Sequence, residues 1–215
     1  MFFRRTINTM NQPRDPMPSL GRMMVFVDGE NLVARYQAML KEGREPQPHV
    51  VHRRDVLVWW AGVVQPGLNV VIRATYYTYV VGSDEAATAA AEAIRGLTFH
   101  QYSVPGQNAL SRLLNTLTPR VFSKPKNRSG KGVDIQMTVD ILSNIYQGNI
   151  ETVFLVSGDG DYEPVLSECR RMGKQVFVAA LSSGLSPKLR LSADLFIDLD
   201  GHFFQAPVLP QLGAA

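Results

Sequence analysis

The chain has 215 residues, of which 45% are hydrophobic and 19% charged, and its formal net charge is +3. These values fit one globular domain with a hydrophobic core and exclude a disordered or fibrous protein. Because the net charge is small, attraction for nucleic acid would depend on how the charges are distributed. The single cysteine, Cys169, excludes an intramolecular disulfide and a zinc site of clustered cysteines. It lies in a run typical of an amphipathic helix, so we expect a packed core thiol.

The two ends of the chain lack the periodic apolar residues of a folded domain. Residues 1–20 and 206–215 contain several prolines, which predicts a flexible arm and a flexible tail around a domain of residues 21–205. The charged start of the chain is not followed by the apolar stretch of a signal peptide. No apolar run approaches the roughly 18 residues of a membrane span. We therefore expect a cytoplasmic protein without a membrane partner.

Between the ends, short apolar runs alternate with helical patterns. Buried strands are expected at 23–27, 69–79, 152–156 and 175–180, a weaker one at 98–104, and an edge strand at 195–199. Helices are expected at 31–41, 53–64, 85–95, 133–145, 162–172 and 187–191. The stretch between 104 and Gly130 has prolines and basic residues and is expected to be irregular. This alternation predicts an α/β fold with a mainly parallel sheet covered on both faces.

Carboxylates follow two of the predicted strands and open one predicted helix. Asp28 and Gly29 end the first strand, Asp159 and Asp161 follow the strand at 152–156, and Asp134 opens the helix after Gly132. In an open parallel sheet these positions meet at the carboxyl ends of the strands. Each acid alone could be a turn residue or a helix N-cap.

Several carboxylates at one edge of a sheet repel each other and need a cation to hold them together. Ligands that are all oxygen favour Mg²⁺ or Mn²⁺ over zinc. Such an ion orients a water, lowers its pKa and neutralises charge on a phosphoryl group. The sequence therefore predicts hydrolysis of phosphodiesters.

Three segments carry a resemblance to a known family. Residues 26–32 (FVDGENL), 131–135 (KGVDI) and 156–164 (VSGDGDYEP) resemble the NYN domain family of PIN-like nucleases, and the likeness extends over about 23–199. The resemblance implies a three-layer α/β/α sandwich with a central, mainly parallel sheet, and metal-dependent cleavage of RNA as an endoribonuclease.

The resemblance also implies the site residues. The acidic positions of the family correspond to Asp28, Asp134, Asp159 and Asp161, and its polar residue after the first strand corresponds to Asn31. Asp140 also lies in a family-like stretch. It follows Asp134 by six residues, which is about 120° around a helix, so we expect a structural role.

A stretch without acidic residues precedes Asp134. The interval after Glu92 holds the basic residues Arg95, Arg112, Arg120, Lys124, Lys126, Arg128 and Lys131. It could guide an RNA backbone by unspecific attraction, or it could be a solvated basic loop. The predicted RNA-binding residues are Lys124, Lys126, Arg128, Lys131 and Ser157. Tyr102 and Phe122 could stack bases, although aromatic residues near strands more often belong to the core, as at least one of Trp59 and Trp60 should.

Three functional hypotheses remain open. A ribonuclease is favoured, and a nucleic-acid-binding or protein-binding module that keeps the fold without cutting is the main alternative. A phosphatase similar to haloacid dehalogenases would require a second Asp two residues after Asp28, where Glu30 stands. The sequence leaves open the RNA target, the base preference, endo or exo cleavage and a homo-oligomeric state.

Overall fold

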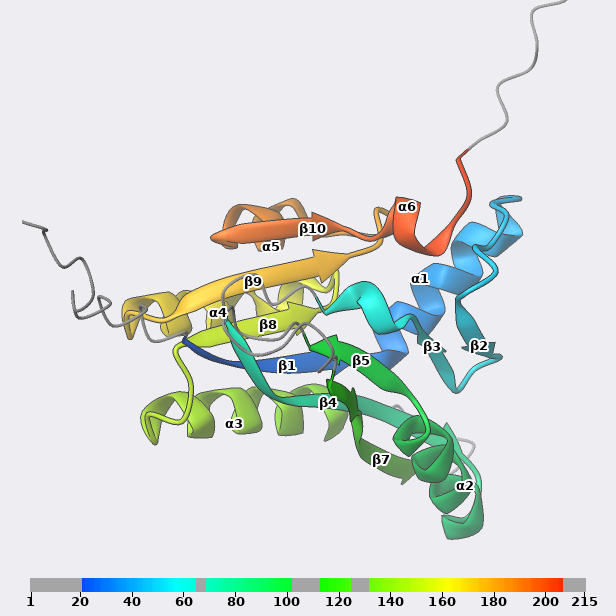
Figure 1. The fold of residues 1–215 in the computed structure, drawn as a ribbon, viewed down its shortest axis with the longest axis horizontal. Helices are drawn as coiled ribbons and strands as arrows, with labels where there is room; N and C mark the ends of the chain where they lie inside the picture. The colour runs from blue at the N-terminus through cyan, green and yellow to red at the C-terminus, as the bar shows by residue number, and fades with distance from the viewer. Residues whose placement is uncertain (1–20, 65–68, 102–112, 125–131, 207–215) are drawn as a thin grey trace, which may run out of the picture.

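The computed structural model describes residues 21–64, 69–101, 113–124 and 132–206. Its centre is a six-stranded sheet in which all neighbouring strands are parallel (Figure 1). The strand order is β10 (Leu195–Asp198), β9 (Gln175–Ala180), β8 (Thr152–Val156), β1 (Arg22–Asp28), β4 (Val70–Val81) and β7 (Thr118–Lys124). The predicted parallel α/β sandwich is confirmed.

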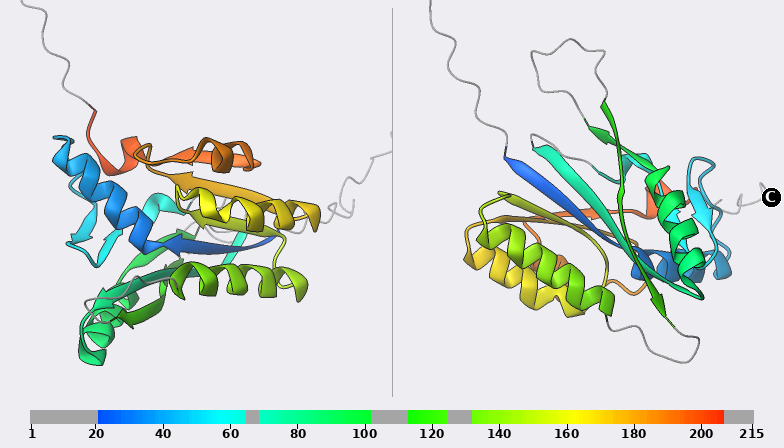
Figure 2. Two further views of the ribbon diagram at one scale, coloured as in Figure 1. Left: turned by 180° about the vertical axis from the view of Figure 1, so that it is seen from behind. Right: turned by 90° about the horizontal axis from the view of Figure 1, so that it is seen from below.

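Each face of the sheet packs against its own hydrophobic core, because successive side chains of a strand point to opposite faces. Along β1, Met23, Val25 and Val27 enter one core and Met24 and Phe26 enter the other. The first core also contains residues of α1 (Gly29–Lys41), α2 (Asp84–Arg95) and α6 (Asp200–Phe203). The second contains residues of α3 (Gly132–Tyr146), α4 (Glu163–Arg171) and α5 (Pro187–Leu191). Figure 2 shows α3 and α4 side by side on that face.

The prediction of a helix at 53–64 is wrong. The segment forms a hairpin of β2 (Val51–Arg53) and β3 (Leu57–Trp59), followed by the short 3-10 helix η1 (Ala61–Val63). Asp55 makes the turn with φ of 58°, a left-handed conformation that a helix interior does not contain. All three residues of β3 are buried, and burial of Trp59 confirms that at least one tryptophan belongs to the core.

The region expected to be irregular contains two strands. The predicted strand at 98–104 is β5 (Thr98–Gln101), and it pairs with β6 (Leu113–Thr116) in a separate antiparallel ladder. The strand β7 then joins the main sheet at its edge beside β4. Pro119 lies within β7, and an edge strand tolerates proline because one side of its backbone has no partner strand.

Other expectations agree with the structure. Cys169 is fully buried, and burial raises the pKa of its thiol to about 12, as a packed core thiol requires. None of the helices in the described parts of the chain is long and apolar enough to cross a membrane. The predicted arm, most of the predicted tail, Tyr102, Arg112, Lys126, Arg128 and Lys131 lie outside the described residues.

Candidate active site

Asp28 is the last residue of β1 and is buried, with 3% of its surface exposed. Its Oδ1 accepts a hydrogen bond of 3.0 Å from the backbone N–H of Asn31 and so caps α1. Its Oδ2 accepts from the hydroxyl of Ser157 at 3.0 Å. The next residue must be glycine, because a Cβ on Gly29 would lie 2.1 Å from the ring of Tyr76. This carboxylate is therefore held on both oxygens at the carboxyl edge of the sheet.

The surroundings of Asp28 make its negative charge unfavourable. Burial, with smaller contributions from the nearby charges of Asp134 and Asp159, raises the pKa of its carboxyl to about 7. The hydrogen bonds from Asn31 and Ser157 lower the pKa, but they do not offset the burial. The three carboxylates of Asp28, Asp134 and Asp159, here called the acid cluster, thus lie within electrostatic reach of one another.

The turn after β8 is fastened to the start of α1. The N–H of Gly158 donates to Asn31 Oδ1 at 3.1 Å, and the N–H of Asp159 donates to Ser157 Oγ at 3.1 Å. Asp159 Oδ1 in turn accepts from the N–H of Asp161 at 3.0 Å and caps the 3-10 helix η2 (Gly160–Tyr162). The N-caps are therefore Asp28 and Asp159, whereas Asp134 and Asp161 lie inside the first turns.

Tyr162 connects the acid cluster to α3, and the sequence reasoning missed it. Its phenol is buried and donates to Asp134 Oδ1 at 2.9 Å. Burial and the charges of Asp28, Asp134 and Asp159 raise the pKa of this phenol, so it remains a donor. The position of Tyr162 directly after the acidic turn could have indicated a role in the site, although the sequence pattern predicts only that a helix begins there.

A second tyrosine at the same edge was also missed. Tyr79, near the end of β4, donates its hydroxyl to the carboxylate of Glu30 in the first turn of α1. Burial, Glu30, Asp134 and Asp28 raise the pKa of Tyr79. Glu30 and Tyr79 therefore border the acid cluster on the side of α1 and β4.

The other predicted residues lie at varying distances from this centre. Asp161 is exposed, and its backbone rather than its carboxylate makes the contact with Asp159. Asp140 accepts from Tyr77 and from Gln136, both at 2.8 Å, and pairs with Arg120 at 3.8 Å, which supports a structural role. The backbone of Lys124 ends β7 at the carboxyl edge, paired in register with Val81 of β4.

The donor chemistry of the acid cluster fits a hard cation that keeps its water shell. Within the described segments, no three acidic, histidine or cysteine side chains converge into a ready set of metal ligands. A compact zinc-type cage is therefore not formed by these residues. Mg²⁺ commonly keeps several waters and is bound by only one or two carboxylates. The buried Asp28, the half-buried Asp159 and the exposed Asp134 offer only oxygen donors, which suit such an ion.

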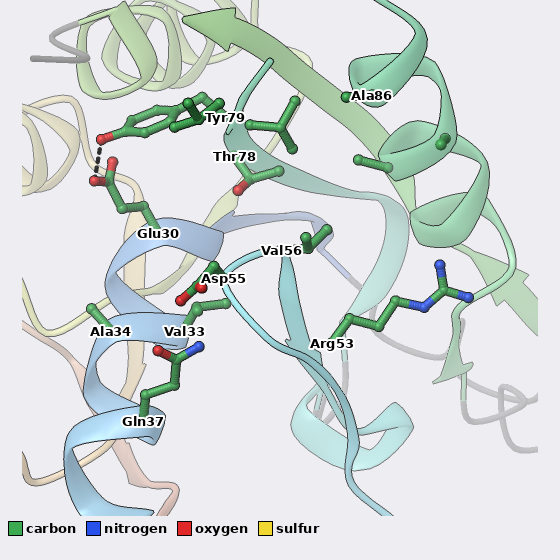
Figure 3. A pocket seen from close by; sticks show the side chains of 14 residues that line it. Glu30, Val33, Ala34, Gln37, Arg53, Asp55, Val56, Thr78, Tyr79 and Ala86 are labelled. Carbon is green, nitrogen blue, oxygen red and sulfur yellow. Dashed lines mark hydrogen bonds between the residues drawn. The ribbon is translucent and has the colours of Figure 1, made fainter. Parts of the chain in front are cut away.

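A pocket of about 730 Å³ adjoins the acid cluster (Figure 3). It lies between α1, the β2–β3 hairpin, the end of β4 and α2. Glu30 and Tyr79 belong both to its lining and to the border of the acid cluster. The pocket and the acid cluster are therefore neighbours at the carboxyl edge of the sheet.

Comparison with known proteins adds to this geometry. The model of the protein family described as NYN domain matches residues 22–200. An uncharacterized protein of Methanocaldococcus jannaschii is 31% identical over 97 residues, which is 45% of this chain and 40% of that protein, so less than half of that relative is matched. A crystal structure of a protein of unknown function from Vibrio parahaemolyticus is similar with a TM-score of 0.52 and 19% identity. This similarity covers 86% of this chain and 96% of that one and concerns the fold.

Proposed function

Because this chain belongs to the NYN domain family of PIN-like nucleases, we propose that it is a metal-dependent endoribonuclease. The proposed catalytic residues are Asp28, Asn31, Asp134, Asp159 and Asp161. One observation carries the proposal. Acidic side chains from three distant segments gather at one edge of the sheet, where the buried Asp28 has its pKa raised to about 7 by burial and by its acidic neighbours.

A divalent cation, Mg²⁺ or Mn²⁺, would be held by Asp28, Asp134 and Asp159, with Asp161 beside them. When bound, such an ion activates water and neutralises charge on the phosphoryl group. A cation also compensates the charge that burial and repulsion disfavour on Asp28. This requirement for compensation supports a metal-dependent reaction over a simple turn role for these acids.

The remaining polar residues would orient the acids and the substrate. Ser157 bonds both Asp28 and the backbone of Asp159, and Tyr162 holds Asp134. Asn31 uses its Oδ1 to fix Gly158, while its Nδ2 donates to none of the described residues. This amide is a suitable donor to a phosphate oxygen. Lys124, Lys126, Arg128 and Lys131 would attract the RNA backbone from the segment between β7 and α3.

The test is cleavage of end-labelled single-stranded and structured RNA with Mn²⁺, with Mg²⁺ or with chelator. We expect internal cuts that require the metal and that disappear in Asp159→Asn. A chromogenic phosphomonoester serves as the second substrate and should not be hydrolysed. Tight RNA binding without cleavage would favour the non-cutting module, and cleavage that survives chelator would contradict the metal requirement.

A further inference from the structure

We infer that the pocket beside the acid cluster receives one base of the RNA substrate, next to the phosphodiester that is cut. This inference rests on the proposed function. It follows from the position of the pocket, from the chemistry of its lining and from a buried donor that lacks a partner.

The pocket is positioned to hold a nucleotide adjacent to the scissile bond. Glu30 follows Asp28 by two residues and lines the pocket, while Tyr79 bonds Glu30 and lies within the field of Asp134 and Asp28. In Figure 3 the Tyr79 ring and Glu30 lie at one end of the pocket, with Gln37 further along α1. An RNA chain whose phosphate lies at the acids therefore has its neighbouring base within reach of this pocket.

The lining favours a flat, uncharged group over a phosphate. The walls are mainly apolar and include Val33, Val56, Val80 and Ala90. The charged lining residues are two acidic residues, Glu30 and Asp55, and one basic residue, Arg53, so the formal charge of the lining is negative. A pocket of this size, apolar with a few polar groups, is typical of sites for small organic groups. In single-stranded RNA the base is the group that leaves the stack and enters such pockets.

Gln37 supplies the polar contact that a base needs. Its Nε2 has no hydrogen-bond partner among the described residues and is covered while the pocket is empty, so the amide must rotate to reach a base. A buried donor without an acceptor destabilises a protein, and each of the four bases carries acceptors on its edges. The hydroxyl of the buried Thr78 lies on the opposite side, from β4. Figure 3 shows the Gln37 amide directed from α1 into the pocket.

The experiment combines a substrate change with a pocket-filling variant. RNA oligonucleotides carry one abasic nucleotide at successive positions around the cut. For the wild type, an abasic nucleotide at one position should lower kcat/KM at least about tenfold, and at other positions much less. Ala86→Phe fills the pocket from α2, where Ala86 is exposed, and should remove the difference between intact and abasic RNA. Thr88→Phe, exposed on the same helix and outside the lining, is the matched control and should keep it.

A second readout does not depend on cleavage. Binding of the four free nucleosides is measured by ligand-observed NMR in chelator, with thermal melting as a check that each variant is folded. The wild type and Thr88→Phe should bind at least one nucleoside, Ala86→Phe should not, and Gln37→Leu should change which nucleoside binds best. If RNA is cut but Ala86→Phe still discriminates abasic RNA as the wild type does, the base pocket is overturned while the nuclease stands. If no RNA is cut, the proposed function fails, and the nucleoside measurement alone decides the base pocket.

Discussion

The phenol of Tyr162 donates a hydrogen bond of 2.9 Å to the carboxylate of Asp134. The two residues lie 28 positions apart in sequence, in η2 and in the first turn of α3. Because Tyr162 is buried, its hydroxyl fixes Asp134 relative to the turn that carries Asp159. This bond makes the acid cluster a property of the packed fold rather than of any one segment.

Removal of this hydroxyl should weaken the site and leave the fold intact. Tyr162→Phe deletes one hydrogen bond worth about 1 kcal/mol, so we expect cleavage to fall roughly fivefold, at about 1.36 kcal/mol per factor of ten. The loss of activity should become smaller as the Mn²⁺ concentration is raised, because Asp134 would still bind the ion when the metal site is saturated. Tyr146→Phe is the control because Tyr146 makes a similar bond of 2.7 Å to Glu168 on an exposed surface. Equal losses in both variants would contradict a positioning role for Tyr162.

Asp159 should separate the role of its charge from its role as a cap. Asp159→Asn keeps an oxygen that can cap η2 but removes the negative charge. We expect RNA cleavage to fall by roughly 10² to 10³, as the loss of a few kcal/mol of transition-state stabilisation implies, and the metal-free melting temperature to be equal or higher. Asp159→Ala should be as inactive but less stable than Asp159→Asn by about 1 kcal/mol, because the cap is removed. Cleavage like that of the wild type in Asp159→Asn would remove Asp159 from the site.

The buried Asp28 should make the metal-free protein less stable as the pH rises. Its pKa is about 7 when folded and 3.8 as the reference value, so between these values the folded state binds a proton that the unfolded state has released. The free energy of unfolding should therefore fall from about pH 4 to pH 7, by at most about 4 kcal/mol. Above pH 7 Asp28 is ionised in both states, so the stability that its bound proton supplied is lost and no further fall is expected from this group.

Thermal melting in chelator across this range checks the sign. Asp28→Asn should flatten the decline, since an amide does not titrate in this range. Added Mn²⁺ should raise the melting temperature of the wild type at pH 8 and have little effect on Asp28→Asn. Stability that rises with pH in the chelated wild type would contradict the assigned state of Asp28.

The basic stretch before α3 should bind RNA by charge. With Lys124, Lys126 and Arg128 changed together to Glu, affinity should fall for unrelated RNA sequences. The slope of log affinity against log salt should decrease by roughly 0.7 for each phosphate of a single strand that the protein no longer neutralises. The matched control changes Arg170, Arg171 and Lys174, at the opposite edge of the sheet where β9 begins, and should leave the slope unchanged. An equal effect of both triple variants would place the RNA path elsewhere.

Much of the sheet could be predicted because its strands are buried on both faces. In β1, β8 and β9 this burial is visible as continuous apolar runs, and the acids after β1 and β8 then follow from the direction of parallel strands. The β2–β3 hairpin could not be recognised from the sequence. Its apolar residues pack in the same core as α1, and they do not follow the alternating apolar and polar pattern that is typical of a strand. For β7, Pro119 obscured an edge strand whose pairing depends on β4.

The supporting residues of the site were harder to predict than the acids. A tyrosine beside an apolar run is equally consistent with a core residue and with a hydrogen-bond donor, and Tyr162 is both. The packing of α3 against α4 in the second core brings Asp134 within hydrogen-bond distance of Tyr162. The pocket likewise depends on four elements that meet only in the folded chain.

The pairing of β1 between β4 and β8 has a consequence for the order of events during synthesis. Asp28 emerges early, yet the hydroxyl that bonds it belongs to Ser157, 129 residues later. Such long-range parallel pairing is slow to form. A partly synthesised chain therefore carries Asp28 without its partners, and the means of cutting RNA would arise only after most of the domain has left the ribosome.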